Sequence, residues 1–119
     1  MQISTIINAT DVEVSARDES INVLNFNYNK KIFYLPIKVS EKFPSLEVYY
    51  AFSCSLTTIS KANFAGLSRL RVLDLSVNQI EKLRSDTFEG LETMDTLYLC
   101  KFLLFRCLNI YWKSFLTQI

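Results

Sequence analysis

The feature that most constrains this sequence is an internal repeat with a period of 24 residues. Leu46, Leu70 and Met94 recur at that spacing, and six further apolar positions recur with them. Those positions are Tyr49, Leu73 and Leu97; Ala51, Leu75 and Leu99; Leu56, Ile80 and Leu104; Ile59, Leu83 and Cys107; Phe64, Phe88 and Trp112; and Leu67, Leu91 and Phe115. Such self-similarity predicts stacked structural units, because one unit cannot bury its apolar side alone.

An earlier copy of the unit precedes these three. Its matching residues are Ile21, Leu24, Phe26 and Asn29, then one extra residue near Lys30–Lys31, then Ile32 and Leu35. The expected organisation is a lead-in at 1–20, repeats at about 21–45, 46–69, 70–93 and 94–100 onward, and an apolar and basic tail at 101–119 with an incomplete last repeat. The lead-in is expected either to add a strand or to be partly disordered.

Each unit is expected to begin with a short strand. In the third copy Leu73 and Leu75 alternate with Asp74 and Ser76. Successive side chains of a strand point to opposite faces, so the two leucines are expected in the core and the polar pair on the other face. Parallel pairing of the strands then places equivalent residues of adjacent units side by side.

A polar column follows the strand, at the point where the chain turns. Asn78 stands there in the third copy, and its amide can satisfy buried backbone groups of its own unit and of the next one. The same column holds Asn29 in the first copy and Cys54 in the second, where a thiol still donates weakly. We expect these three residues to form a structural ladder along the turns.

The pattern LxxLxLxxNxI, formed by residues 70–80, resembles the leucine-rich repeat, and the resemblance extends over about residues 21–100. The segments FAGLSRL and FEGLETM are similar to the typical extracellular subclass of that family. The run IFYLPIKVSEKFPSLEV, followed by CSLTTISKANFAGL, is similar to the opening repeats of secreted insect leucine-rich repeat proteins. The expected fold is therefore α/β: a short leucine-rich repeat solenoid with a curved parallel β-sheet on its concave side and irregular or short helical convex segments.

Candidate binding residues lie in the columns that point away from the core. Exposed aromatic side chains on a sheet are typical anchors of protein interfaces, although they can also serve only to stabilise cross-strand pairs. The columns are Asn25, Tyr50, Asp74 and Tyr98; Asn27, Phe52, Ser76 and Cys100; and Val23, Val48, Val72 and Thr96. We expect Tyr50, Phe52, Asp74, Ser76 and Tyr98 to be the binding candidates, and the resemblance implies a protein partner held by the concave face.

Other function classes find little support. The net charge of +1 gives no electrostatic indication of a nucleic-acid partner. The segment LYLCKFLLFRCLNIYWKSFL contains three cations, so we expect no membrane span. The chain has no histidine, its three cysteines have no paired spacing, and it contains no phosphate-binding or nucleophile motif. We therefore expect no enzyme, no metal and no cofactor.

The compartment and the ends of the chain leave alternatives open. The resemblance implies an extracellular setting, in which Asn8 of the sequence NAT is a glycosylation site, but the N-terminal residues lack the basic and continuous apolar regions expected of a signal peptide. The alternatives are an intracellular scaffold or a truncated product without a binding role. Phe102 replaces the turn asparagine in the last copy, so we expect an uncapped end that can self-associate.

Overall fold

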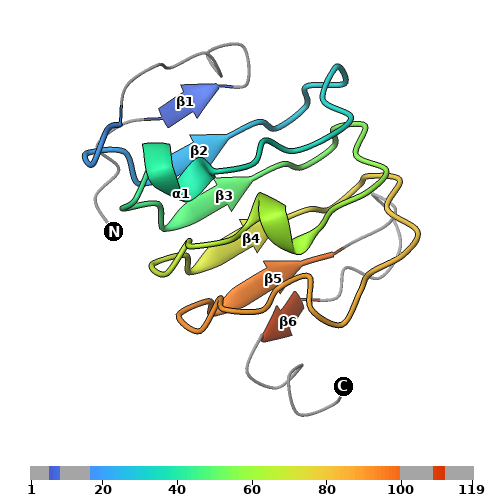
Figure 1. Cartoon of the computed structure of the whole chain (residues 1–119). Coiled ribbons are helices and arrows are strands. Elements are labelled where there is room, and N and C mark those ends of the chain that lie inside the picture. The colour runs from blue at the N-terminus through green and yellow to red at the C-terminus, as the bar shows by residue number, and fades with distance from the viewer. Residues whose placement is uncertain (1–5, 9–16, 100–108, 112–119) are drawn as a thin grey trace.

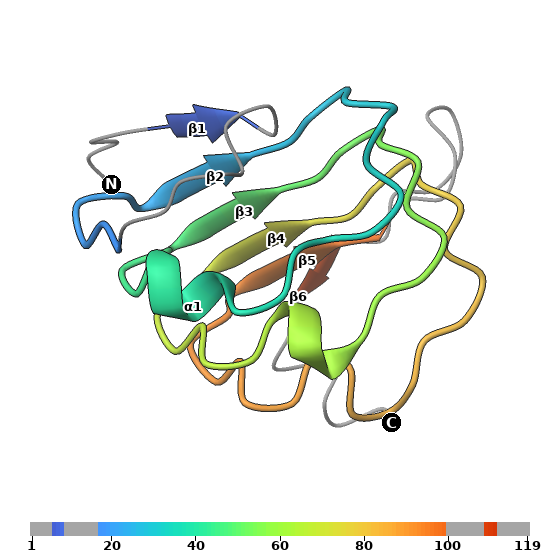
Figure 2. The ribbon, with the colours of Figure 1, turned by 45° about the horizontal axis from the view of Figure 1, so that its top comes forward.

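The computed structural model describes residues 6–8, 17–99 and 109–111 (Figure 1). Its strands form one sheet in the order β1-β2-β3-β4-β5-β6, which is also their order in the chain. The strands are β1 (Ile6–Asn8), β2 (Val23–Asn25), β3 (Val48–Tyr50), β4 (Val72–Asp74), β5 (Thr96–Tyr98) and β6 (Asn109–Tyr111). The opposite side of the molecule carries the short helix α1 (Val39–Lys42) and a 3-10 helix (Lys61–Asn63). Figure 2 shows the chain leaving β2, β3 and β4, crossing this side and returning each time to the next strand.

The parallel sheet follows the repeat. β2, β3, β4 and β5 pair in parallel, with Leu24 beside Tyr49, Tyr49 beside Leu73, and Leu73 beside Leu97. The expected parallel sheet with short helical connections is thus confirmed. β1 also pairs in parallel, through Ile7 and Leu24. β6 differs, because it runs antiparallel to β5 and so does not continue the solenoid direction.

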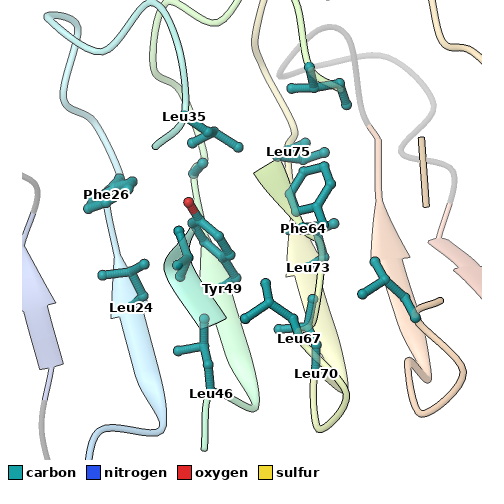
Figure 3. Close-up of a cluster of buried hydrophobic side chains, with 14 of the residues drawn as sticks. Leu24, Phe26, Leu35, Leu46, Tyr49, Phe64, Leu67, Leu70, Leu73 and Leu75 are labelled. Atoms are coloured by element: carbon teal, nitrogen blue, oxygen red, sulfur yellow. The ribbon is translucent and has the colours of Figure 1, made fainter. Parts of the chain in front are cut away.

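The core lies between the sheet and the convex connections (Figure 3). Leu46, Leu70, Leu73 and Leu97 are each 0 % exposed, and Tyr49 lies among them. The rings of an aromatic row run through this core, with adjacent centroids 5.9, 6.2 and 5.6 Å apart; its members are Phe26, Tyr49, Phe64 and Phe88. One continuous apolar cluster therefore joins all the described coils.

The turn after each strand repeats the same backbone conformation. Tyr28, Ser53 and Val77 have φ angles of 65°, 55° and 56°, in the left-handed region. Each of them comes directly before a residue of the polar column. This turn reverses the chain from the sheet toward the convex side, and it needs partners for the backbone groups that no strand reaches.

Asn78 supplies such partners across two coils. Its Nδ2 donates to the carbonyl oxygens of Leu75 and Ser76 in its own coil, at 2.9 and 3.2 Å, and to that of Ala51 in the preceding coil at 2.8 Å. Its Oδ1 accepts from the backbone N–H of Leu56 at 3.1 Å. The side chain is 8 % exposed, so these bonds are shielded from water.

Cys54 and Asn29, the two earlier members of the polar column, make fewer side-chain hydrogen bonds than Asn78 does. The Cys54 thiol donates to the carbonyl of Phe26 in the preceding coil, at a sulfur–oxygen distance of 3.0 Å. Asn29 is half-buried, and its Oδ1 accepts only from the backbone N–H of Lys31, at 3.0 Å in its own loop. The expected ladder therefore has to be corrected at the Asn29 side chain, which among the described residues bonds only within its own loop. The backbone of Asn29 does reach the next coil, through a hydrogen bond with Cys54.

One apolar column also differs from expectation. Leu35 and Ile59 are 4 % and 7 % exposed, whereas Leu83 in the same column is 42 % exposed. Leu35 is followed in the next coil by Ile59, and Ile59 is followed by Leu83. For Leu83 the next member is Cys107, which lies outside the described residues.

Candidate functional site

The concave face, meaning the face of the sheet turned away from the core, presents one row of side chains from the last residue of each strand. Asn25, Tyr50, Asp74 and Tyr98 are neighbours in the parallel register. Adjacent strands are spaced about 4.8 Å apart, so Tyr50 and Tyr98 stand about 10 Å apart on either side of Asp74. All four side chains are half-buried, which leaves part of each one accessible.

The polar members of this row also hold the backbone. Asp74 Oδ1 accepts from the N–H of Ser76 at 2.9 Å, and Asn25 Oδ1 accepts in the same way from the N–H of Asn27 at 2.9 Å. A carboxylate has several acceptor sites, so one such bond leaves Asp74 able to accept from a partner. Tyr50 and Tyr98 supply an apolar ring and a hydroxyl each. The row can therefore receive a surface that carries apolar groups and hydrogen-bond donors.

Phe52 and Ser76 lie beyond the ends of β3 and β4. The alternation of side chains along a strand therefore no longer predicts which face of the sheet they point to. Phe52 is half-buried and packs edge-on against the ring of Tyr28, with centroids 5.3 Å apart. Ser76 is only 4 % exposed, because it sits inside the turn and its carbonyl accepts from Ser53 N–H at 2.9 Å. The expectation that Ser76 offers an exposed side chain is therefore wrong.

The valine column needs a similar correction. Val23 and Val48 are 2 % and 1 % exposed, although they point away from the core and neither belongs to the main apolar cluster. Val72 and Thr96, in the same column, are half-buried. The accessible residues of the concave face are therefore Asn25, Tyr50, Asp74 and Tyr98 at the strand ends, with Val72 and Thr96 beside them.

An ion pair borders the face at the start of β4 and β5. Arg71 Nε lies 3.0 Å from Asp95 Oδ2, and these side chains are 56 % and 49 % exposed. An exposed pair of this kind contributes less than about 1 kcal/mol to stability. Its charges remain available to a partner at the edge of the concave face.

Several polar residues that fix the coils carry no simple sequence signature. Asn27 Oδ1 accepts from the backbone N–H of Phe52 in the next coil at 2.8 Å. On the convex side, Asn63 Oδ1 accepts from Ser60 N–H at 2.7 Å, and Thr87 Oγ1 accepts from Arg84 N–H at 3.2 Å. Asn63 and Thr87 are 24 residues apart, so the repeat could have identified them, but their residue types differ.

The remaining predicted sites are only partly described. Asn8 pairs through its backbone with Asn25, whereas the rest of its sequon lies outside the described residues. Cys54 is a free, buried thiol, and burial raises its pKa. Cys100, Cys107, Phe102 and most of the tail are also outside the described residues. In the part of the chain that is described, no cluster of ligating side chains could hold a metal, and no helix is long and apolar enough to cross a membrane.

Comparison with known protein families agrees with the geometry of the coils. Residues 52–100 match the leucine rich repeat family. This segment is a leucine-rich repeat domain. It contains β4 and β5, the Asn78 turn and the aromatic pair Phe64–Phe88, so the family match and the repeated structure coincide. No curated protein matches the sequence. Leucine-rich repeat domains generally act as protein-interaction modules, and their stacked coils create extended concave surfaces for that purpose.

Proposed function

We propose that this chain is a non-catalytic leucine-rich repeat recognition module that binds a protein partner through Tyr50, Phe52, Asp74 and Tyr98 on its concave face. The parallel register of β3, β4 and β5 carries the proposal, because it puts Tyr50, Asp74 and Tyr98 next to one another with part of each side chain accessible. Tyrosines are frequent hot-spot residues of protein interfaces.

The chemistry of the row favours a particular kind of partner. Asp74 is a carboxylate between two phenol rings. A basic side chain can pair with the carboxylate while its stem or a neighbouring apolar group packs on the rings. The partner surface is therefore expected to present Arg or Lys beside an apolar group.

We further infer an extracellular, innate-immune type of recognition, as in the subclass that the sequence resembles. Only the resemblance carries this inference; Phe64 and Phe88 of the segments that resemble the subclass are 1 % and 4 % exposed and pack 5.6 Å apart in the convex layer. The likeness to secreted insect proteins stays a proposal of the same kind.

Affinity capture followed by a binding measurement tests the proposal. Tyr50→Ala together with Tyr98→Ala is expected to weaken the affinity for a captured and purified partner at least thirtyfold, since a hot-spot aromatic contributes 2 kcal/mol or more. Lys82→Ala, on the exposed convex side, should leave the affinity unchanged. Equal affinity of the double variant and the parent chain would place the binding site elsewhere.

A further inference from the structure

The first coil exposes several large apolar side chains, of which Tyr28 packs against Phe52. Among the described residues, five large hydrophobic side chains are exposed, and four of them lie between positions 28 and 37. They are Tyr28 at 70 %, Phe33 at 54 %, Tyr34 at 72 % and Ile37 at 60 %. The segment that carries them runs from the end of β2 across the convex side to α1, in light blue and teal in Figure 1. Apolar groups gathered on a surface in this way usually mark a contact with something outside the chain.

The other coils show what the fold itself requires at these positions. The backbone N–H of Ser55 bonds to the carbonyl of Ile32, and that of Gln79 bonds to the carbonyl of Leu56, so Ile32 and Leu56 are equivalent. Counting from that pair, Phe33, Tyr34 and Ile37 correspond to Thr57, Thr58 and Lys61 in the second coil and to Glu81, Lys82 and Ser85 in the third. All nine positions are exposed. Two coils therefore fold with polar residues where the first coil carries two aromatic rings and an isoleucine.

Lysines surround these apolar groups. Lys30, Lys31 and Lys38 are exposed, and no acidic residue occurs anywhere between positions 20 and 40. Lys30 Nζ already donates to Ser53 Oγ at 2.8 Å, whereas Lys31 and Lys38 flank Phe33, Tyr34 and Ile37 in the sequence. Positions 20–40 thus carry three positive charges and no negative one, whereas the whole chain has a net charge of only +1; the acidic residues Glu19 and Glu41 flank this stretch.

An apolar hollow opens beside the same segment. It has a volume of about 110 Å³. Leu24, Phe26, Val39 and Phe43 line its interior with Pro36, and Ile37, Lys38 and Lys42 complete the lining. Such a hollow admits a small apolar group, and lysine residues stand among its lining.

We propose that the first-coil surface, defined as Phe33, Tyr34 and Ile37 with Lys31 and Lys38, docks on an anionic lipid bilayer. Aromatic and aliphatic side chains partition into the interfacial region, while lysines reach the headgroups with flexible apolar stems. The hollow suits the same chemistry, because an anionic lipid joins an apolar chain to a negative headgroup. An acidic protein is the other candidate. The charged groups favour the lipid, because the cores of protein interfaces are depleted of lysine and enriched in arginine, and this surface has no arginine.

Vesicle co-sedimentation of the full chain tests the proposal. The protein is expected to bind phosphatidylcholine vesicles that contain phosphatidylserine, to bind pure phosphatidylcholine vesicles much less, and to be released by salt. Replacing Phe33→Thr, Tyr34→Thr and Ile37→Lys installs the residues of the second coil at matched positions, so the fold should persist. We expect this triple variant to lose at least tenfold in partition coefficient, although it gains a positive charge. Lys31→Gln and Lys38→Gln should each reduce binding about fivefold.

Two controls separate the alternatives. Leu83→Thr removes the fifth exposed hydrophobic side chain, and Lys82→Gln removes a cation of the third coil; neither should change vesicle binding. A soluble glutamate- and leucine-rich peptide serves as the protein-like probe. The proposal is overturned if the triple variant binds vesicles as well as the parent chain does. It is also overturned if the peptide binds the first-coil surface while anionic vesicles do not. Neither result depends on Tyr50 or Tyr98, so the proposed concave-face function is tested separately.

Discussion

Asn78 is joined to Ala51 across the boundary between two coils, by a hydrogen bond of 2.8 Å from its Nδ2 to the Ala51 carbonyl. The same side chain accepts from Leu56 N–H, so it satisfies one acceptor and one donor of the preceding coil at once. These groups are buried, and water cannot replace the amide if it is removed. One polar side chain thus couples the stability of two coils that the apolar core already holds together.

Replacing Asn78 by Ala is therefore expected to destabilise the fold by about 3 kcal/mol, since each buried group left without a partner costs about 1–3 kcal/mol. Asn29→Ala is the matched control, because Asn29 stands in the same column and its side chain, among the described residues, has only an exposed bond to Lys31 N–H. Its cost should be about 1 kcal/mol or less. Urea unfolding of both variants measures the difference. Equal losses of unfolding free energy in the two variants would show that the hydrogen bonds of Asn78 to the preceding coil add no stability beyond that of a local turn.

The sequence predicted the fold because the repeat fixes two things together. Period-24 matches identify equivalent residues, and stacking then requires parallel strands with those residues side by side, as Tyr49 and Leu73 are. The candidate site was predictable only as far as the strands extend. Each strand is three residues long, so alternation applies to Tyr50 and Asp74 but not to Ser76, which lies within the turn. The hydrogen-bonding roles of Asn27, Asn63 and Thr87 were missed because hydrogen bonding of turns tolerates several residue types.

The two glycines of the described chain have similar backbones but different surroundings. Gly66 and Gly90 have φ angles of 80° and 88°, and a side chain in this region costs about 1–2 kcal/mol. A Cβ on Gly66 would also lie 2.6 Å from Ser40 Oγ, whereas nothing lies within 4 Å of one on Gly90. Gly66→Ala should therefore cost about 1–3 kcal/mol more than Gly90→Ala in thermal unfolding. Adding Ser40→Ala should recover part of that excess. A double-variant cycle without coupling would contradict the close approach of α1 to this turn.

Val77 occupies a conformation that a β-branched residue rarely adopts. Its φ of 56° repeats the values at Tyr28 and Ser53, so the turn geometry imposes it. Val77→Asn should raise the stability by about 1 kcal/mol, because asparagine tolerates the left-handed region better. Val77→Ile keeps the branched side chain and should give no gain. A loss of stability with Asn, measured by thermal unfolding, would mean that packing of the half-buried valine outweighs the strain.

The hydroxyl of Tyr49 is the one buried side-chain polar atom of the described residues without a hydrogen-bond partner (Figure 3). Leucine stands at the equivalent positions Leu24, Leu73 and Leu97, so the coil does not need a hydroxyl there. Tyr49→Phe keeps the ring that packs against Phe26 and Phe64. We expect this change to stabilise the fold by about 1–3 kcal/mol, the cost of an unsatisfied buried polar group.

The same substitution should change how stability depends on pH. Burial raises the pKa of Tyr49 above its ordinary value of about 10, and the nearby Cys54 adds to that shift. Above pH 10 the unfolded chain therefore releases the Tyr49 proton while the folded chain keeps it, so the free energy of unfolding falls as pH rises. Tyr49→Phe should remove this part of the alkaline loss. Urea unfolding between pH 8 and about pH 11 compares the parent chain with the variant. Parallel profiles for the parent chain and Tyr49→Phe would contradict a buried, un-ionised tyrosine in the core.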